Sequence, residues 1–470
     1  MNRESSAPTI EQQDGLPVPR RYWSVIGIWL ALTMAVLDGA IANVALPTIA
    51  RELGASPAAS VWVINAYQLT ITILLLPLAA LGDRIGYKCI YIPGLALFTL
   101  GSGACALGRT LGLLIAARAF QGIGAACIMS MNAALVRATY PANMLGRGIG
   151  YNAMVISMAA AIGPTLAAVI LGVASWPWLF LINLPIGVAS LLVGRKSLPD
   201  PHGHGQPFDW GSAVLSAAMM GCIVFGAEMF AREGAGLGGV LIAGGVAAGA
   251  ALVWREWREK VPLMPLDLLR IPIFSLSIGT SILSFAAQML AYVALPFLLQ
   301  SVLGRSVFAT GLLMTPWPIA VGIAAPFAGR LADRMPSGLL GGVGLVIFAA
   351  GLFFLSRLGG APGNFDIAWR MAMCGLGFGL FQSPNNRTIV SSAPKPRSGA
   401  AGGMLATARL LGQTAGAVAV GVAFHLAGVH VTPTLLLIAS IAALAAAVIS
   451  LLRLNVEPPE RVAVYKPILD

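Results

Sequence analysis

Apolar residues occur along this chain in long runs that short polar segments separate. Fourteen runs of roughly 17 or more residues can be counted, and a helix of that length crosses the ~30 Å hydrocarbon core of a membrane. The runs do not alternate polar and apolar positions as the strands of a membrane barrel do. The pattern therefore predicts an all-α membrane protein with fourteen transmembrane helices, near residues 24–46, 62–81, 89–108, 111–136, 149–173, 178–194, 210–230, 237–254, 273–298, 309–329, 338–356, 368–390, 399–427 and 431–452.

The composition and the placement of charge agree with a membrane location. Of the 470 residues 57% are hydrophobic and only 10% charged, whereas about 25% are charged in soluble proteins. The net charge is +11, and 21 of the 29 Lys and Arg fall on the side of the membrane that holds both termini, against 6 on the other side. This is the positive-inside pattern. It predicts cytoplasmic termini, and it accounts for the basic charge without a nucleic-acid partner.

Few charged residues interrupt the predicted spans: Asp38, Arg118, Glu228 and Arg409. An ionised side chain in lipid costs on the order of 3 kcal/mol, so each needs a partner, water or a function. Apolar surroundings raise the pKa of a carboxyl and a guanidinium lowers it, so an Asp38–Arg118 pair is suited to reversible proton transfer. The alternative is a static ion pair that joins two helices. Glu228 either takes part in proton coupling or forms a surface i, i+4 pair with Arg232.

Polar and aromatic residues recur at positions that could face a cavity. Aromatic walls with few hydrogen-bonding groups suit an amphipathic organic molecule, including a cation held by ring faces. Helix packing and placement at the membrane interface explain part of the same set. The candidate cavity residues are Asn43, Trp62, Asn65, Gln68, Gln121, Asn152, Phe285, Gln288, Tyr292, Trp317, Phe381, Gln382, Arg409 and Gln413.

Motifs for other chemistry are missing from the sequence. No lysine follows a glycine, so no phosphate-binding P-loop is present. The four histidines and five cysteines lack the spacing of a catalytic or metal site. We therefore expect a protein that is not an enzyme, that needs no cofactor or metal, and that draws on a proton gradient.

Two similar loops indicate an internal repeat. "GDRIGYK" (82–88) follows the second predicted span, and "AGRLADR" (328–334) follows the tenth. These places are equivalent in two six-helix halves only if spans seven and eight are an insertion. We predict an N-terminal tail over 1–20, a six-helix bundle over 21–196, a linker with two inserted helices over 197–260, a second bundle over 261–455 and a C-terminal tail over 456–470.

Several motifs in the right order resemble the major facilitator superfamily and, within it, the fourteen-span drug:proton antiporters, which are multidrug efflux transporters. "LDGAIANVALP" (37–47) is similar to the first-span signature and "GDRIGYK" to the loop that latches a gate. "RAFQGIGAA" (118–126) and "GPTLAA" (163–168) are similar to the fourth-span and antiporter motifs.

The resemblance implies two six-helix bundles that open alternately to each side of a bacterial cytoplasmic (inner) membrane. It implies proton-coupled export of hydrophobic or cationic organic compounds, with Asp38 changing protonation beside Arg118. A bundle of this size can work as a monomer, which we expect here. The gating residues are then Gly82, Asp83, Arg84, Gly86, Lys88, Asp333 and Arg334, and the antiporter residues Gly163 and Pro164. A proton-coupled carrier of one metabolite stays open as an alternative.

Overall fold

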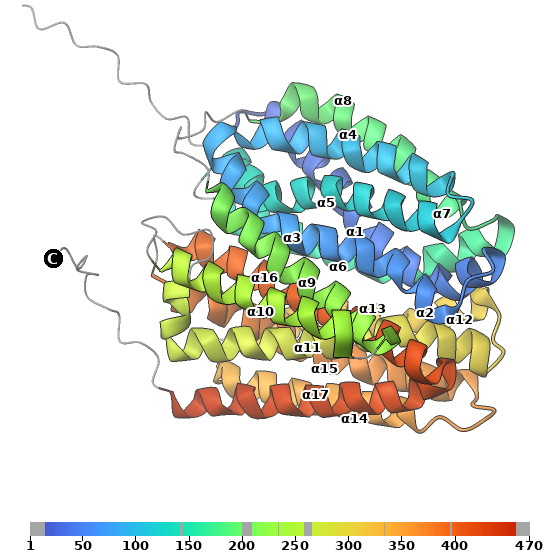
Figure 1. The fold of residues 1–470 in the computed structure, drawn as a ribbon. Coiled ribbons are helices and arrows are strands. Elements are labelled where there is room, and N and C mark those ends of the chain that lie inside the picture. The colour runs from blue at the N-terminus through green and yellow to red at the C-terminus, as the bar shows by residue number, and fades with distance from the viewer. Residues whose placement is uncertain are drawn as a thin grey trace, which may run out of the picture.

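The computed structural model describes residues 15–141, 144–199, 209–233, 235–257, 266–332, 334–394 and 397–456, and within these ranges the chain is helical without a strand. The long helices run side by side and are joined by short loops (Figure 1). The helices are α1 (Arg20–Glu52), α2 (Pro57–Ser60), α3 (Trp62–Ile85), α4 (Tyr87–Ala106), α5 (Leu111–Thr139), α6 (Leu145–Val173), α7 (Trp178–Leu181), α8 (Asn183–Ser197), α9 (Trp210–Glu233), α10 (Ala235–Glu256), α11 (Pro272–Phe297), α12 (Val307–Met314), α13 (Pro316–Leu331), α14 (Ser337–Ser356), α15 (Asn364–Ser392), α16 (Ser398–Ala427) and α17 (Thr432–Leu452).

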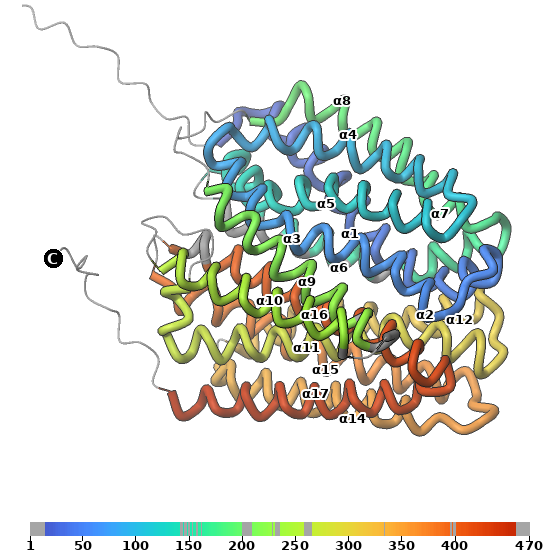
Figure 2. Tube along the Cα trace, viewed as in Figure 1, coloured from blue at the N-terminus to red at the C-terminus, as the bar shows by residue number. Residues whose placement is uncertain are grey.

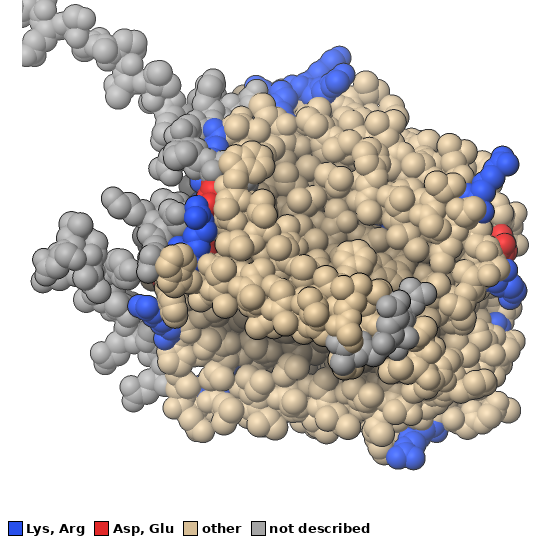
Figure 3. All heavy atoms as spheres, viewed as in Figure 1, with Lys and Arg blue, Asp and Glu red and all other residues tan. Residues whose placement is uncertain are grey.

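The surface and the helix lengths define a multi-pass membrane protein, which confirms the all-α prediction. Within the described ranges, thirteen spans are long and apolar enough to cross a bilayer. The predicted run that is not among them, 368–390, lies in α15, which is 29 residues long but carries polar residues such as Gln382 and the buried Asn385. On the face seen in Figure 3 the charged side chains gather at the two ends of the molecule and leave an uncharged band between them.

The two halves of the chain repeat one packing arrangement. A Cβ on Gly124 of α5 would lie 2.3 Å from the Phe98 nitrogen and 2.6 Å from the Gly94 oxygen of α4. A Cβ on Gly377 of α15 would meet Phe348 and Gly344 of α14 at the same two distances. Small residues at such crossings let helix backbones approach closely. The shared geometry supports the internal repeat that the two similar loops indicate.

Helices α9 and α10 form a hairpin between the two halves of the sequence. Figure 1 shows this green pair lying across α3 and α16, and Trp62 of α3 stacks on Phe225 of α9 with ring centroids 5.1 Å apart. At its base Arg255 pairs with Asp209 at 2.9 Å. Burial raises the pKa of Asp209, but hydrogen bonds from Arg255 and Ser212 outweigh it and lower the pKa to about 2. The hairpin therefore covers one of the two lines along which the halves meet, the α3–α16 seam.

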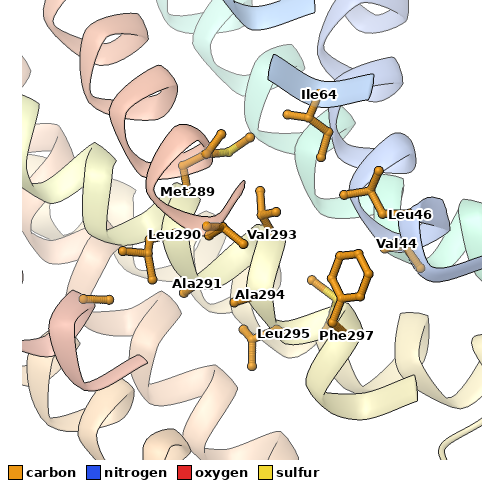
Figure 4. Close-up of a cluster of buried hydrophobic side chains, with 14 of the residues drawn as sticks. Val44, Leu46, Ile64, Met289, Leu290, Ala291, Val293, Ala294, Leu295 and Phe297 are labelled. Atoms are coloured by element: carbon orange, nitrogen blue, oxygen red, sulfur yellow. The ribbon is translucent and has the colours of Figure 1, made fainter. Parts of the chain in front are cut away.

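The halves share a hydrophobic core at one end of the bundle only. We call the end where α1 begins and α17 ends the terminal end, and the opposite end the distal end (Figure 2). Distally, Val44 and Leu46 of α1 and Ile64 of α3 face Met289, Val293 and Phe297 of α11 in one buried cluster (Figure 4). Toward the terminal end the buried residues form two clusters, one in each half, apart from Leu410 of α16, which joins the first. The distal end is therefore the closed end of this conformation.

A second distal contact depends on a glycine in α12. A Cβ on Gly311 would lie 2.4 Å from Ala168 Cβ and 2.5 Å from the Pro164 carbonyl oxygen of α6. Nearby, the Thr165 and Thr315 hydroxyls are 2.6 Å apart. We call this contact between α6 and α12 the α6–α12 seam.

We expect Gly311→Val to force the α6–α12 seam apart and to destabilise this closed conformation by about 1–3 kcal/mol, because overpacking costs that much. Thermal unfolding of the detergent-solubilised protein measures the loss, and spin labels on α6 and α12 measure the separation. Gly322→Val on α13 is the matched control, since its Cβ meets nothing within 4 Å. Equal behaviour of the two variants would contradict the close contact.

Candidate functional site

A cavity of about 210 Å³ lies between the two halves. Helices α1, α3, α5 and α6 contribute to it from the first half, and α11, α13, α15 and α16 from the second. The wall of the first half is mainly aliphatic, with Asn43, Tyr67, Gln68 and Arg118 as its polar groups. The wall of the second half is aromatic and polar, with Phe285, Gln288, Tyr292, Phe378, Gln382, Arg409 and Gln413.

A buried ion pair lies directly behind the first wall. Asp38 of α1 is 2% exposed and Arg118 of α5 is 0% exposed, and the Arg118 Nη1 donates to Asp38 Oδ2. Two charges removed from water at such depth are stabilised only when they are paired and their remaining polar atoms are hydrogen-bonded. The structure thus brings together the two residues that the sequence suggests as a proton-coupling pair.

Three further side chains complete the surroundings of the Asp38 carboxylate. Gln121 of α5 donates to Asp38 Oδ1 at 3.0 Å, and Asn183 of α8 donates to the same oxygen at 2.8 Å. Both amides also donate to the Ser102 hydroxyl of α4, at 2.7 and 3.3 Å. Ser102 is not among the residues expected from the sequence, because a serine in a run of small residues reads only as a place of close helix approach. We call Asp38, Ser102, Arg118, Gln121 and Asn183 the Asp38 network.

Arg118 connects the Asp38 network to the cavity. Its Nε donates to the Val63 carbonyl of α3 at 3.1 Å, and its guanidinium carbon lies 4.1 Å from the centre of the Tyr67 ring. Arg118 lines the cavity, whereas Asp38 does not. A change in the charge of Asp38 therefore reaches a bound molecule through this guanidinium.

The structure distributes the other expected cavity residues between two environments. Eight of them line the cavity: Asn43, Gln68, Phe285, Gln288, Tyr292, Gln382, Arg409 and Gln413. The remaining six lie outside its lining: Trp62, Asn65, Gln121, Asn152, Trp317 and Phe381. Trp62 packs on the inserted hairpin, Gln121 belongs to the Asp38 network, and Trp317 lies behind the cavity against Tyr292, with ring centroids 4.9 Å apart.

The first of the expected gating loops forms a tight connection at the terminal end. Gly82 is buried, and a Cβ there would lie 2.3 Å from Met131 Sδ of α5. Gly86 ends α3 with φ of +99°, a backbone conformation that favours glycine. The Tyr87 hydroxyl donates to Asp83 at 2.9 Å. Arg84 and Lys88 are half-buried in this loop.

Two other expected residues cannot be placed. Asp333 and the side chain of Glu228 lie outside the part of the chain that the structure describes. Arg334 is exposed in the turn after α13. Glu228 falls on α9 of the inserted hairpin, so its predicted part in proton coupling stays a prediction.

The two residues expected to form an antiporter motif, Gly163 and Pro164 of α6, lie at a crossing with two other helices. A Cβ on Gly163 would lie 2.4 Å from Ala40 Cβ of α1, and the Pro164 carbonyl faces Gly311 of α12. Proline inside a helix removes one hydrogen bond and bends it. This segment therefore sets how closely α6 approaches α1 in its own half and α12 in the other half.

Comparison with known proteins defines the class of this transporter. The sequence profile described as Major Facilitator Superfamily matches residues 28–417, with a further match over 276–466. The chain therefore belongs to the major facilitator superfamily, and it is a membrane transporter rather than an enzyme.

Three curated relatives carry names that describe different transport roles. The "Uncharacterized transporter YebQ" of Escherichia coli is 52% identical over 94% of this chain and 98% of its own length. The "Riboflavin transporter RibZ" of Clostridioides difficile is 30% identical over 83% of this chain and 86% of its own. The "Tetracenomycin C resistance and export protein" of Streptomyces glaucescens is 30% identical, over 86% and 76%.

We expect Asp38→Asn or Arg118→Gln alone to destabilise the protein by about 3–5 kcal/mol, because either change leaves a buried charge without its counter-charge. The double variant should lose less stability than the two single variants lose together, since neither charge then remains. Thermal unfolding in detergent, followed by tryptophan fluorescence, measures both.

Arg370→Gln is the control, because Arg370 forms a partly exposed i, i+4 pair with Asp366 and such pairs contribute about 0–1 kcal/mol. Strictly additive losses at Asp38 and Arg118 would show that the two charges do not stabilise each other.

Proposed function

We propose that this transporter is a proton-coupled antiporter that exports hydrophobic organic compounds across a bacterial cytoplasmic membrane, with both termini in the cytoplasm. The observation that carries the proposal is the Asp38–Arg118 pair, buried one side chain away from a cavity between two halves that are closed distally. A protonatable group in that place can take up a proton in one conformation and release it in the other.

The coupling follows from the charges in the Asp38 network. When Asp38 takes up a proton, the Arg118 guanidinium loses its only counter-ion among the described residues around it. Arg118 then favours a conformation that exposes its charge to water or to a bound molecule, because an unpaired charge in a low-dielectric site is costly. The protonation of Asp38 and the conformation of the cavity wall are thereby linked through one side chain, as proton-coupled transport requires.

The energy available is adequate for efflux. Moving one charge across 100 mV supplies about 2.3 kcal/mol, and a tenfold proton gradient adds about 1.4 kcal/mol. Together they sustain a substrate gradient of roughly a few hundredfold by one-for-one exchange.

The relatives support two readings of the substrate. The tetracenomycin C export protein supports drug efflux, and the riboflavin transporter supports a carrier for one metabolite, which we keep as the second candidate. The sequence also allows a cationic substrate held by aromatic ring faces. Among the described residues that line the cavity none is a carboxylate, so the lining offers a cation no counter-charge.

Proton release on ligand binding tests the proposal. Detergent-purified protein near neutral pH is mixed with ethidium or with riboflavin, and the released protons are measured with a pH-indicator dye. We expect the unaltered protein to release protons on binding and Asp38→Asn to bind without release, because its amide does not titrate.

Asp366→Asn is the matched control, since it removes a carboxylate paired with Arg370 outside the cavity lining, and it should release protons as the unaltered protein does. Equal release from Asp38→Asn would make that pair a static one. Release with riboflavin but not with ethidium would favour the metabolite carrier.

A further inference from the structure

Arg409 is a cation in the cavity wall without an anionic neighbour. It lies on α16, one turn before Gln413, and lines the cavity. Its Nε is buried without a hydrogen-bond partner, and the described residues offer it no ion pair. Arg118 differs because it is paired with Asp38. Arg453, the other buried arginine, donates to Ser277, Asn385 and Ser450.

The charge of Arg409 cannot be removed by titration. A guanidinium stays protonated in proteins. Arg409 is half-buried, and a charge that is partly removed from water without a counter-charge is destabilising. The Asp38–Arg118 pair is neutral as a unit, so the described residues in and behind the cavity wall leave one positive charge uncompensated. An anionic ligand in the cavity would supply the missing counter-charge, and its binding would be stabilised by pairing with Arg409.

The side chains around Arg409 indicate the shape and polarity of the rest of that ligand. Phe285 and Phe378 line the same cavity and meet edge to face, with ring centroids 5.3 Å apart. Gln288 and Gln382 add amides that can donate or accept. The volume of about 210 Å³ is below the roughly 300–1,000 Å³ of pockets for drug-sized ligands. The lining therefore fits a small, flat, mostly apolar molecule.

We propose that the cavity binds small aromatic monoanions, with the carboxylate of the ligand on Arg409 and its ring against Phe285 and Phe378. A planar guanidinium matches a carboxylate with two parallel hydrogen bonds. The inference rests on the proposed transport function and narrows its substrate class to weak organic acids, whereas the sequence suggests hydrophobic or cationic compounds.

Ligands of matched shape and different charge test this assignment. The full-length protein in detergent is titrated calorimetrically with 2-naphthoate, neutral 2-naphthamide and cationic 2-naphthylmethylammonium. We expect 2-naphthoate to bind at least tenfold more tightly than the amide, and the cation to bind most weakly. Equal affinities, or a preference for the cation, would overturn the proposal. Tighter binding of 2-naphthyl phosphate than of 2-naphthoate would overturn the assignment to carboxylates.

Variants then assign the preference to one side chain. Arg409→Gln should bind the amide as before and lose the preference for 2-naphthoate, and Arg409→Lys should keep part of it. Arg357→Gln is the charge-matched control, because Arg357 lies outside the cavity lining against Phe353, with its guanidinium carbon 5.3 Å from the ring centre. A preference that survives in Arg409→Gln would overturn the proposal.

Thermal unfolding separates loss of binding from loss of fold. Because Arg409→Gln removes an unpaired charge, its melting temperature without ligand should be no lower than that of the unaltered protein. Added 2-naphthoate should raise the melting temperature of the unaltered protein and not that of the variant; the same rise in both would count against Arg409. The titration needs no proton gradient, so a preference for 2-naphthoate without proton release would refute the coupling and leave the binding assignment intact.

Discussion

The buried Asp38–Arg118 pair is the interaction on which the first half of this transporter depends. Through Ser102, Gln121 and Asn183 it ties α1, α4, α5 and α8 together, and through the Val63 carbonyl it reaches α3. An apolar membrane interior offers these helices no hydrophobic driving force toward one another, so polar contacts and close packing hold them together. The same pair includes a carboxylate that lies one side chain behind the cavity wall, so the residues that hold these helices together are also those of the proposed proton coupling.

The internal repeat shows that this pair is an addition to a common scaffold. When the matching glycines of α5 and α15 are superimposed, Met371 stands at the place of Arg118 and Cys374 at the place of Gln121, and both are buried. At these two positions the second half therefore carries apolar side chains, and its buried polar contacts centre instead on Arg453, which donates to Ser277 and Asn385. Its contribution to the cavity is instead Arg409 and the aromatic wall. In the proposed mechanism, proton chemistry and ligand recognition thus fall to different halves, with the cavity between them.

Much of the fold and half of the site could be predicted from the sequence, for physical reasons. Membrane spans follow from apolar length, and Asp38 with Arg118 follows because charges within spans are few and must pair. The direction in which a polar side chain points does not follow, since helices that are apolar on every side carry a weak periodic signal. Trp62 contacts Phe225 of the inserted hairpin, and no local pattern reveals where that hairpin packs. Asn183 and Ser102 enter the site only through the packing of α4 and α8.

The contacts between the halves constrain how the closed end can change. At the α3–α16 seam Gln68 donates to Gln413 and the hydroxyls of Thr72 and Thr414 are 3.1 Å apart, all near the middle of their helices. The distal contact is mostly apolar, around Val44 and Phe297. Breaking hydrogen bonds inside a membrane leaves unsatisfied polar groups, whereas separating an apolar contact costs only in proportion to the area exposed to water. A rotation about the polar middle that splits the distal core would therefore keep the hydrogen bonds of the α3–α16 seam, while it breaks the distal Thr165–Thr315 contact and the one from Gln300 to the Val44 carbonyl. Because the α9–α10 hairpin covers the α3–α16 seam, it would keep lipid away from these polar pairs during such a rotation.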